Sequence, residues 1–431
     1  MGFRLDLRCS AIALAIAATL ATIPLHAAEK GDPSLSASAQ FRQSAQAAQT
    51  SLQSGDLAGA SGAIGALAPA TPLEKYLASS LAMELAVRRN DVVGQRKAVA
   101  QILESGGAPQ EQMSWLNSVA GYLSYQTGAM DNAATYLARA RSLGVTDSRT
   151  ALMLVETYVR QRKPADAAKL LDEVISAQVQ ARQAVPPSWY DRAASLAYGR
   201  KDWAAVSRYN AAKLASVSPT AAADWRTPIV TYEEWATLDP EAKLDLYRLQ
   251  AATGGLASER DFEGYAALAA AQGYPAEAKS IVDVGQSTGN LTASNATITS
   301  LMKTVKSKAT VHLATIRGLS GKSASASTAA KASKGGDDLM ANSQFAEAAA
   351  YYHVALDKSP TDRDRVMTRY GIALARSGDL DGAKSAFSQV TGPWAQVATY
   401  WNAWVLARVQ AQTPGATAVP AVTPAAVKPT K

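Results

Sequence analysis

The sequence predicts an all-α fold in which helical hairpins stack one after another along a solenoid. Three observations carry this prediction. The chain is 48% hydrophobic but only 7% aromatic, so alanine and leucine supply much of its apolar content, a balance that favours close helix packing over a β-sandwich. An apolar motif recurs at a near-constant interval, and glycines stand in register with it. With 431 residues, the chain is long enough for several domains or for one extended array.

The first 27 residues are predicted to be a cleavable secretory signal peptide. Arg4 and Arg8 precede an apolar run over 11–23, and cleavage is expected after Ala27. A membrane anchor is the alternative, but a run of about 13 apolar residues is shorter than the roughly 20 that span a bilayer. The mature protein is therefore expected in a bacterial periplasm, or secreted. Cys9, the only cysteine, would leave with the signal, so no disulfide or thiolate site is expected.

A motif of three positions, spaced by four and then three residues, marks one face of a recurring helix. It is clearest in SQFAEAAAYYHVALDKSP at 343–360, where Ala348, Tyr352 and Ala355 occupy the three positions. The slot near 314 fits poorly, because Gly318 stands where a large residue is needed. The interval is roughly 36 residues, which is typical of a helical solenoid. The motif begins at Ala60, Gln95, Ala133, Ala167, Val206, Ala242, Ala278, Ala348 and Ala383.

Each copy of the motif is preceded by a second pattern and by a turn glycine. Ahead of Ala383, the residues Met367, Tyr370, Gly371 and Leu374 alternate large, large, small and large. This arrangement resembles the tetratricopeptide repeat family, most strongly at 113–146, 149–176 and 333–390, although the family tryptophan is mostly missing. The resemblance covers nearly all of the mature chain and implies a right-handed α-solenoid. An irregular helical bundle is the alternative. The inter-helix turns carry Gly55, Gly128, Gly273 and Gly378, since a positive φ is easily adopted only by glycine.

The array is predicted to form two repeat blocks, 37–284 and 336–410, joined by a basic linker over 285–335 that holds a degenerate repeat. A proline- and alanine-rich tail over 411–431 is expected to be disordered. GKSASASTAAKASKGG within the linker is typical of a flexible segment. Three interpretations of its charge are open: a solvated linker, weak contact with anionic lipid or glycan, or nucleic-acid binding, which the signal peptide disfavours. The linker has no acidic residue but carries Lys303, Lys306, Lys308, Arg317, Lys322, Lys331 and Lys334.

The helix predicted before the tail is rich in aromatic residues. Trp394, Tyr400, Trp401 and Trp404 lie at helical spacing. They form either an aromatic recognition face or a capping helix that covers the last repeat. Because an array needs its final hydrophobic face covered, a capping helix is predicted.

No catalytic, metal or cofactor site is expected. After signal cleavage, only His312 and His353 remain as histidines, and they are too far apart in sequence to suggest a metal cluster. GLSGKS at 318–323 is similar to a phosphate-binding loop, but Ile316 stands where the first glycine belongs. The chain is therefore not expected to be an enzyme.

The resemblance implies that partners bind the concave wall formed by the first helix of each hairpin. Aromatic and arginine side chains dominate binding hot spots. A protein or peptide partner of the cell envelope is predicted, in envelope assembly, secretion or cell-wall machinery. A glycan- or peptidoglycan-binding subunit of an envelope enzyme complex is the alternative, and an unused, solvated groove is another. The inward positions of the best repeats are Trp115, Tyr122, Tyr125, Arg149, Glu156, Arg160 and Tyr198.

Overall fold

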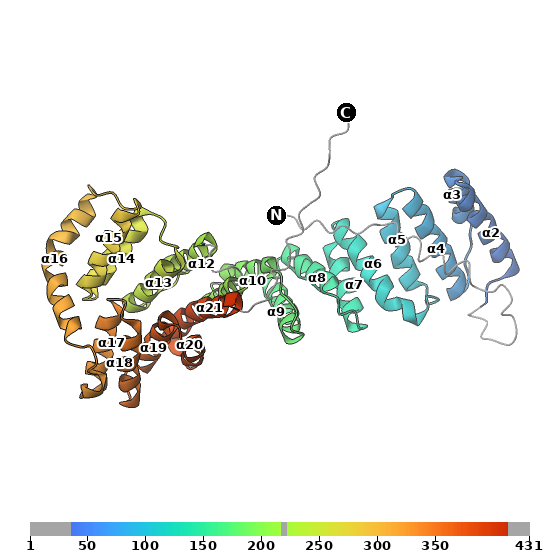
Figure 1. The fold of residues 1–431 in the computed structure, drawn as a ribbon. Coiled ribbons are helices and arrows are strands. Elements are labelled where there is room, and N and C mark those ends of the chain that lie inside the picture. Colours follow the sequence, from blue (N-terminus) through green and yellow to red (C-terminus); the bar gives the residue numbers. More distant parts are fainter. Residues whose placement is uncertain (1–35, 217–221, 413–431) are drawn as a thin grey trace. The chain divides into compact units, whose positions relative to one another are not determined.

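The fold is all helical in the part of the chain that the structure, a computed structural model, describes. It describes residues 36–216 and 222–412, in which helices and turns occur and no strand is found. The expected signal peptide and almost all of the expected tail lie outside these residues. Within the two ranges, no helix is both long and apolar enough to cross a membrane. The chain divides into two compact units, residues 1–184 and 185–431, called the N-terminal and C-terminal units below (Figure 1).

Four hairpins of consecutive helices form the described part of the N-terminal unit. Asp56, Asp91 and Asp147 cap helices by accepting a hydrogen bond from a backbone N–H of the first turn. The hairpins pair α2 (Ala39–Ser54) with α3 (Leu57–Gly65), α4 (Pro72–Arg88) with α5 (Val92–Glu104), α6 (Met113–Gln126) with α7 (Met130–Ser142), and α8 (Ser148–Arg160) with α9 (Pro164–Gln180).

The predicted register of these hairpins is confirmed. Ala60, Ala133 and Ala167, which begin the recurring motif in α3, α7 and α9, are fully buried. The small residue of the preceding helix is also explained: a Cβ on Gly121 of α6 would lie 2.6 Å from the Leu137 side chain of α7. A small residue on one helix thus receives a large residue of the next, as close helix crossing requires.

The C-terminal unit contains twelve α-helices within its described residues. It begins with α10 (Pro187–Gly199), α11 (Trp203–Ala215), α12 (Ala222–Trp235), α13 (Pro240–Thr253), α14 (Glu259–Ala271) and α15 (Pro275–Ser287). It continues with α16 (Ala296–Arg317), α17 (Ala329–Met340), α18 (Phe345–Asp357), α19 (Arg363–Ser377), α20 (Leu380–Phe387) and α21 (Ala395–Gln412).

The expected linker over 285–335 is mostly helical in the structure. Its acid-free sequence conceals a core face on α16, whose six buried residues alternate at intervals of four and three positions. That spacing is the ordinary signature of one buried helix face, and the abundance of lysine obscured it. The buried residues of α16 are Ile298, Met302, Val305, Ala309, His312 and Ile316.

The low-complexity stretch KASKGG is likewise not a linker but part of α17. A Cβ on Gly335 would lie 2.6 Å from the Tyr351 ring, and one on Gly336 would lie 2.8 Å from the Tyr352 ring. The two glycines therefore let α17 approach the paired tyrosines of α18 closely. Both tyrosines are buried, which accounts for the regular build of residues 343–360.

A buried network of charges connects helices that are distant in sequence. Arg369 of α19 bonds Asp245 of α13 at 3.1 Å and Asp337 of α17 at 2.9 Å. Arg248 of α13 bonds Glu277 of α15 at 2.7 Å. Charges in such a position are stable only when paired and hydrogen-bonded, so the network fixes how α13, α15, α17 and α19 pack.

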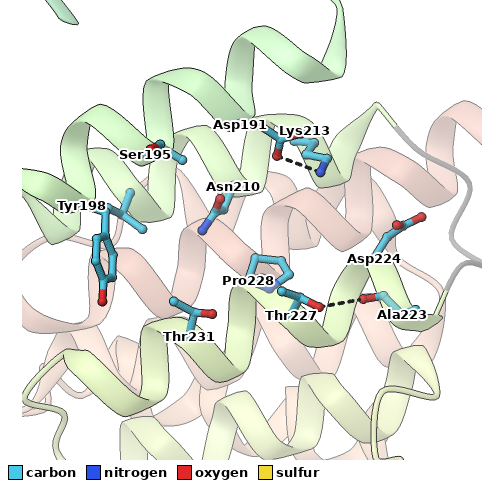
Figure 2. A pocket seen from close by; sticks show the side chains of 12 residues that line it. Asp191, Ser195, Tyr198, Asn210, Lys213, Ala223, Asp224, Thr227, Pro228 and Thr231 are labelled. Carbon is cyan, nitrogen blue, oxygen red and sulfur yellow. Dashed lines mark hydrogen bonds and ion pairs between the residues drawn. The ribbon is translucent and has the colours of Figure 1, made fainter. Parts of the chain in front are cut away.

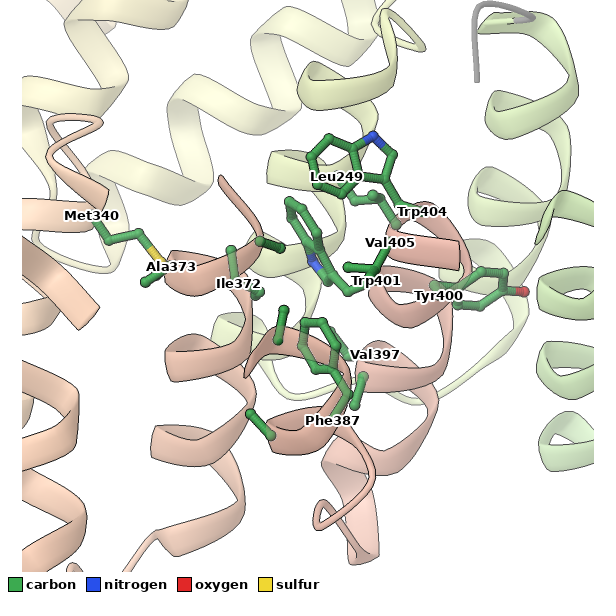
Figure 3. Packing of buried hydrophobic residues seen from close by; sticks show 14 of the residues in the cluster. Leu249, Met340, Ile372, Ala373, Phe387, Val397, Tyr400, Trp401, Trp404 and Val405 are labelled. Atoms are coloured by element: carbon green, nitrogen blue, oxygen red, sulfur yellow. The ribbon is translucent and has the colours of Figure 1, made fainter. Parts of the chain in front are cut away.

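The last helix, α21, covers the final hairpin as expected, but it also packs against α11 and α13. Trp401 donates a hydrogen bond of 3.0 Å from its indole N–H to the Asp245 carbonyl, and the Tyr400 hydroxyl lies 3.4 Å from the side chain of Asn210. Figure 3 shows Trp401 and Trp404 among apolar neighbours that include Leu249 and Val405. The alternative of an aromatic recognition face is wrong for Tyr400, Trp401 and Trp404, because all three are buried.

The two-block division that the sequence suggested differs from the observed one. The unit boundary falls between Ala184 and Val185, and helices α10 to α15, expected in the first block, share a compact unit with α16 to α21. Contacts such as that between Trp401 and Asp245 join positions 156 residues apart. Because such pairing depends on the folded chain, the local spacing of apolar residues did not reveal it.

Candidate partner-binding site

The predicted concave-wall residues of the N-terminal unit lie on α6 and α8, the first helices of two consecutive hairpins, and these two helices contact one another. On α6, Trp115, Tyr122 and Tyr125 follow each other at helical spacing and are partly exposed. Trp115 and Tyr122 also pack against a hydrophobic cluster that contains Leu116. These two side chains therefore serve the core with one part of the ring and the surface with the other.

A cation–π contact joins the two helices at the surface. The guanidinium carbon of Arg160 on α8 lies 4.3 Å from the centroid of the Tyr125 ring on α6. Glu156, one turn before Arg160, lies 3.9 Å from its Nε atom. The structure thus brings three of the predicted residues together into one patch, hereafter the Tyr125 patch (Tyr125, Glu156 and Arg160). Arg149, at the beginning of α8, is exposed and stands two turns from Glu156.

Tyr198, the seventh predicted residue, belongs to the other unit and to a different site. It lies at the end of α10 and lines a cleft of about 360 Å³ formed with α11 and α12. Figure 2 shows the side chains of Tyr198, Asn210 and Thr231 around this cleft. Grouping Tyr198 with the residues of α6 and α8 followed repeat position and took no account of the unit boundary.

The Tyr198 cleft combines polar groups with one irregular helix. Lys213 bonds Asp191 at 2.8 Å on one side (Figure 2). On the other, Pro228 lies inside α12, and because proline has no N–H, the Asp224 carbonyl lacks the hydrogen bond that residue 228 would otherwise donate. The cleft therefore presents an ion-paired carboxylate and ammonium group beside a helix that lacks one backbone hydrogen bond.

An aromatic cluster that sequence reasoning missed stands beside the cleft. The rings of Trp203 and Trp235 meet the Tyr198 ring edge to face, at centroid distances of 5.4 and 6.0 Å. Trp235 is 58% exposed and Tyr198 39% exposed, which is unusual for such large rings. The position of Trp235 within a helical segment was only a weak sign of a surface site in the sequence. Its contact with Tyr198 forms only when α10 and α12 come together in the folded chain.

The seven basic residues of 285–335 are all exposed. Lys303, Lys306 and Arg317 share one face of α16 by helical periodicity, whereas Lys308 lines a different, shallow hollow beside His312. Lys322 lies in the loop after α16. On α17, Lys331 is exposed and Lys334 is bonded to Asp338. The cations thus spread over several faces, and contact with an anionic surface stays a prediction.

In the described ranges, no group of three or more histidine, cysteine, aspartate or glutamate side chains could hold a metal ion. His312 pairs with Asp338 at 2.9 Å, and His353 pairs with Asp357 at 3.1 Å on the surface. Each of these residues is accounted for by a neighbouring carboxylate within the fold.

No protein-family model matches the sequence, and no curated protein matches it either. Solved structures do resemble it. A tetratricopeptide repeat protein from Parabacteroides merdae is 11% identical with a TM-score of 0.28, covering 78% of this chain and 100% of that one. Naa15/Naa10 bound to HypK-THB is 12% identical with a TM-score of 0.36, covering 87% and 69%. The TPR2AB domain of yeast Sti1, in a complex with pHSP90, is 14% identical with a TM-score of 0.23, covering 68% and 99%.

The hairpins of the chain itself carry the structural conclusion. The fold is a tetratricopeptide-like α-solenoid. Its repeats follow the predicted motif in α3, α7, α9, α18 and α20, where the alanine that begins each copy of the motif is fully buried.

Proposed function

We propose that this chain is an exported, non-enzymatic scaffold that binds a protein or peptide partner on the first helices of its hairpins. The Tyr125 patch is the observation that carries the proposal. Tyr125 is partly exposed and Arg160 is exposed, and the cation–π contact places the guanidinium group of Arg160 over the Tyr125 ring. Rigid aromatic area and a forked hydrogen-bond donor are the features that strengthen peptide binding most.

The place of action that we propose is the cell envelope, in assembly, secretion or cell-wall machinery. Support comes from the signal-like sequence of residues 1–27, with Arg4 and Arg8 before an apolar run and Ala27 at the expected cleavage point. Intact-mass measurement of the periplasmic protein tests this part. A mass that still includes Met1 or Cys9 would contradict it.

The binding proposal is tested by photocrosslinking in envelope fractions, with the crosslinker placed at Trp115. A defined partner band is expected with the wild-type patch and should be lost in the Tyr125→Ala/Arg160→Ala variant, because both contacts are then missing. Arg139→Ala is the matched control, since Arg139 is exposed on α7, a second helix. Equal crosslinking in all three proteins would contradict a role for the patch.

A glycan-binding function is the second candidate, favoured by the exposed rings of Tyr198 and Trp235 beside the α10–α12 cleft. Aromatic rings with one free face stack on sugar rings in the way that they cover other apolar surfaces. Co-sedimentation with purified peptidoglycan should then fall in a Trp235→Ala variant and stay unchanged in Tyr125→Ala/Arg160→Ala. The opposite pattern would favour the peptide scaffold.

A further inference from the structure

Arg376, in the last turn of α19, differs from four other partly or fully buried arginines of its unit. Its guanidinium carbon lies 4.5 Å from the centroid of the Phe345 ring. Among the residues that the structure describes, no side chain or backbone group forms a hydrogen bond or ion pair with it. Buried cations normally have a carboxylate partner. Four others do: Arg226 pairs with Asp261, Arg248 with Glu277, Arg365 with Asp337, and Arg369 with Asp245.

A small cavity lies on one side of Arg376. Its volume is about 130 Å³, close to the roughly 150 Å³ at which an apolar cavity accepts a benzene molecule. Three polar residues at its wall are already engaged with one another, because Glu277 accepts hydrogen bonds from both Arg248 and Tyr265. The rest of the lining combines apolar side chains with the hydroxyl groups of Ser280 and Ser343; the apolar ones include Ala251, Ile281, Met340, Phe345, Ile372 and Trp401.

An open groove of about 280 Å³ lies on the other side, and Arg376 lines both spaces. A second arginine, Arg408 of α21, lines this groove and stacks on Trp404, with its guanidinium carbon 4.8 Å from the ring centroid. Burial lowers the pKa of Arg376, and the charge of Arg408 lowers it further. Neither arginine is paired with a carboxylate among residues 36–216 and 222–412, so two like charges held on aromatic rings leave a local surplus of positive charge.

We propose that Arg376 and Arg408 bind the carboxylate of a ligand whose neighbouring group is apolar and about as large as one aromatic ring. The guanidinium fork matches the two oxygens of a carboxylate, and the cavity beside Arg376 offers the side chains of Met340, Phe345 and Ile372 to the ring. A carboxylate also supplies the counter-charge that the described part of the chain does not provide. The site lies wholly within the C-terminal unit and shares no residue with the Tyr125 patch, so it is independent of the proposed function.

The test uses the full mature chain and three probes, followed by NMR of methyl-labelled methionine, in which Met340 reports on the cavity. The first probe is 3-phenylpropanoate, the second is its neutral amide, and the third is N-acetyl-Ala-Phe. Saturable shifts of the Met340 signal are expected with the two acids and not with the amide. Tighter binding of N-acetyl-Ala-Phe would identify the end of a polypeptide as the source of the carboxylate, and equal or weaker binding would identify a free aromatic acid.

Variants separate the site from a general effect of charge. Arg376→Gln should weaken binding of 3-phenylpropanoate about tenfold or more, and Arg408→Gln about two- to fivefold, because a hydrogen bond to an ionised group is stronger where it is less hydrated. Lys384→Gln, which removes an exposed cation of α20, is the control and should leave binding unchanged. Unaltered thermal unfolding of Arg408→Gln, which is exposed, guards against misfolding. Binding of the amide as tight as the acid, unchanged binding in both arginine variants, or no Met340 shift at all would overturn the proposal.

Discussion

Arg369 and Asp245 are 124 residues apart in the chain and form an ion pair of 3.1 Å in which neither side chain is exposed to solvent. Arg369 also bonds Asp337 at 2.9 Å, so one guanidinium group holds α13, α17 and α19 together. A charge in this position has given up its hydration, and its stability depends entirely on its partners.

Replacing Arg369 with methionine is expected to destabilise the C-terminal unit by about 3–5 kcal/mol, because two buried carboxylates lose their shared counter-charge. The free energy of unfolding is measured by urea denaturation, followed by tryptophan fluorescence. Arg160→Met is the control, since Arg160 is exposed, and it should change stability by about 0.5 kcal/mol or less. Equal losses in the two variants would contradict a structural role for the network.

The alanine register gives a second prediction. Ala348 is fully buried in α18, whereas Ala350 of the same helix is exposed. Ala348→Leu should overpack the helix crossing and destabilise the protein by about 1–3 kcal/mol. Ala350→Leu should have little effect. Thermal unfolding of the two variants compares them directly, and similar shifts would leave the register unsupported.

The glycine–tyrosine contact of α17 and α18 is tested in the same way. A Cβ on Gly336 would lie 2.8 Å from the Tyr352 ring, whereas one on Gly199 of α10 would meet nothing within 4 Å. Gly336→Ala should therefore destabilise the protein, despite the better helix propensity of alanine. Gly199→Ala should be neutral or stabilise by up to about 1 kcal/mol. A stabilising Gly336→Ala change would show that the two helices are not closely packed.

Acid stability should depend on Glu74, whose carboxylate ties the beginning of α2 to α4. Burial by itself would raise the pKa of Glu74, but backbone N–H donors of Ser38, Ala70 and Thr71 lower it from 4.5 to about 2. A depressed pKa stabilises the fold above the unfolded value, so this stability should be lost as the pH falls from 4.5 to about 2. In Glu74→Gln, the slope of unfolding free energy against pH should be smaller within this window. An unchanged slope would argue against these hydrogen bonds.

Limited trypsin digestion distinguishes the observed unit boundary from the expected linker. Arg182 is exposed between α9 and α10, next to the boundary at 184/185, and its φ is 55°. The first internal cut is expected there, because cleavage requires a backbone that opens without unfolding a unit. Early cutting at Lys331 or Lys334, which lie on α17, would favour the two-block organisation predicted from sequence.

The sequence by itself determined the local order of this protein. The alanines at 133, 167, 348 and 383 and the turn glycines predicted hairpins and their buried faces correctly, because a helix exposes its periodicity in the spacing of its residues. Trp115, Tyr122, Tyr125, Glu156 and Arg160 were also found on α6 and α8, since their positions within a repeat depend on neighbours close in sequence.

Only the tertiary structure decided how the hairpins of the C-terminal unit combine. The pairings of Arg369 with Asp245 and of Trp401 with the Asp245 carbonyl span 124 and 156 residues, and no local pattern encodes such a choice of partner. The same reason separates Tyr198 from the other predicted residues and leaves Arg376 without a carboxylate partner among the residues that the structure describes. Helix periodicity is a property of near neighbours in the chain, whereas the pairing of buried charges is a property of groups that meet only when the chain has folded.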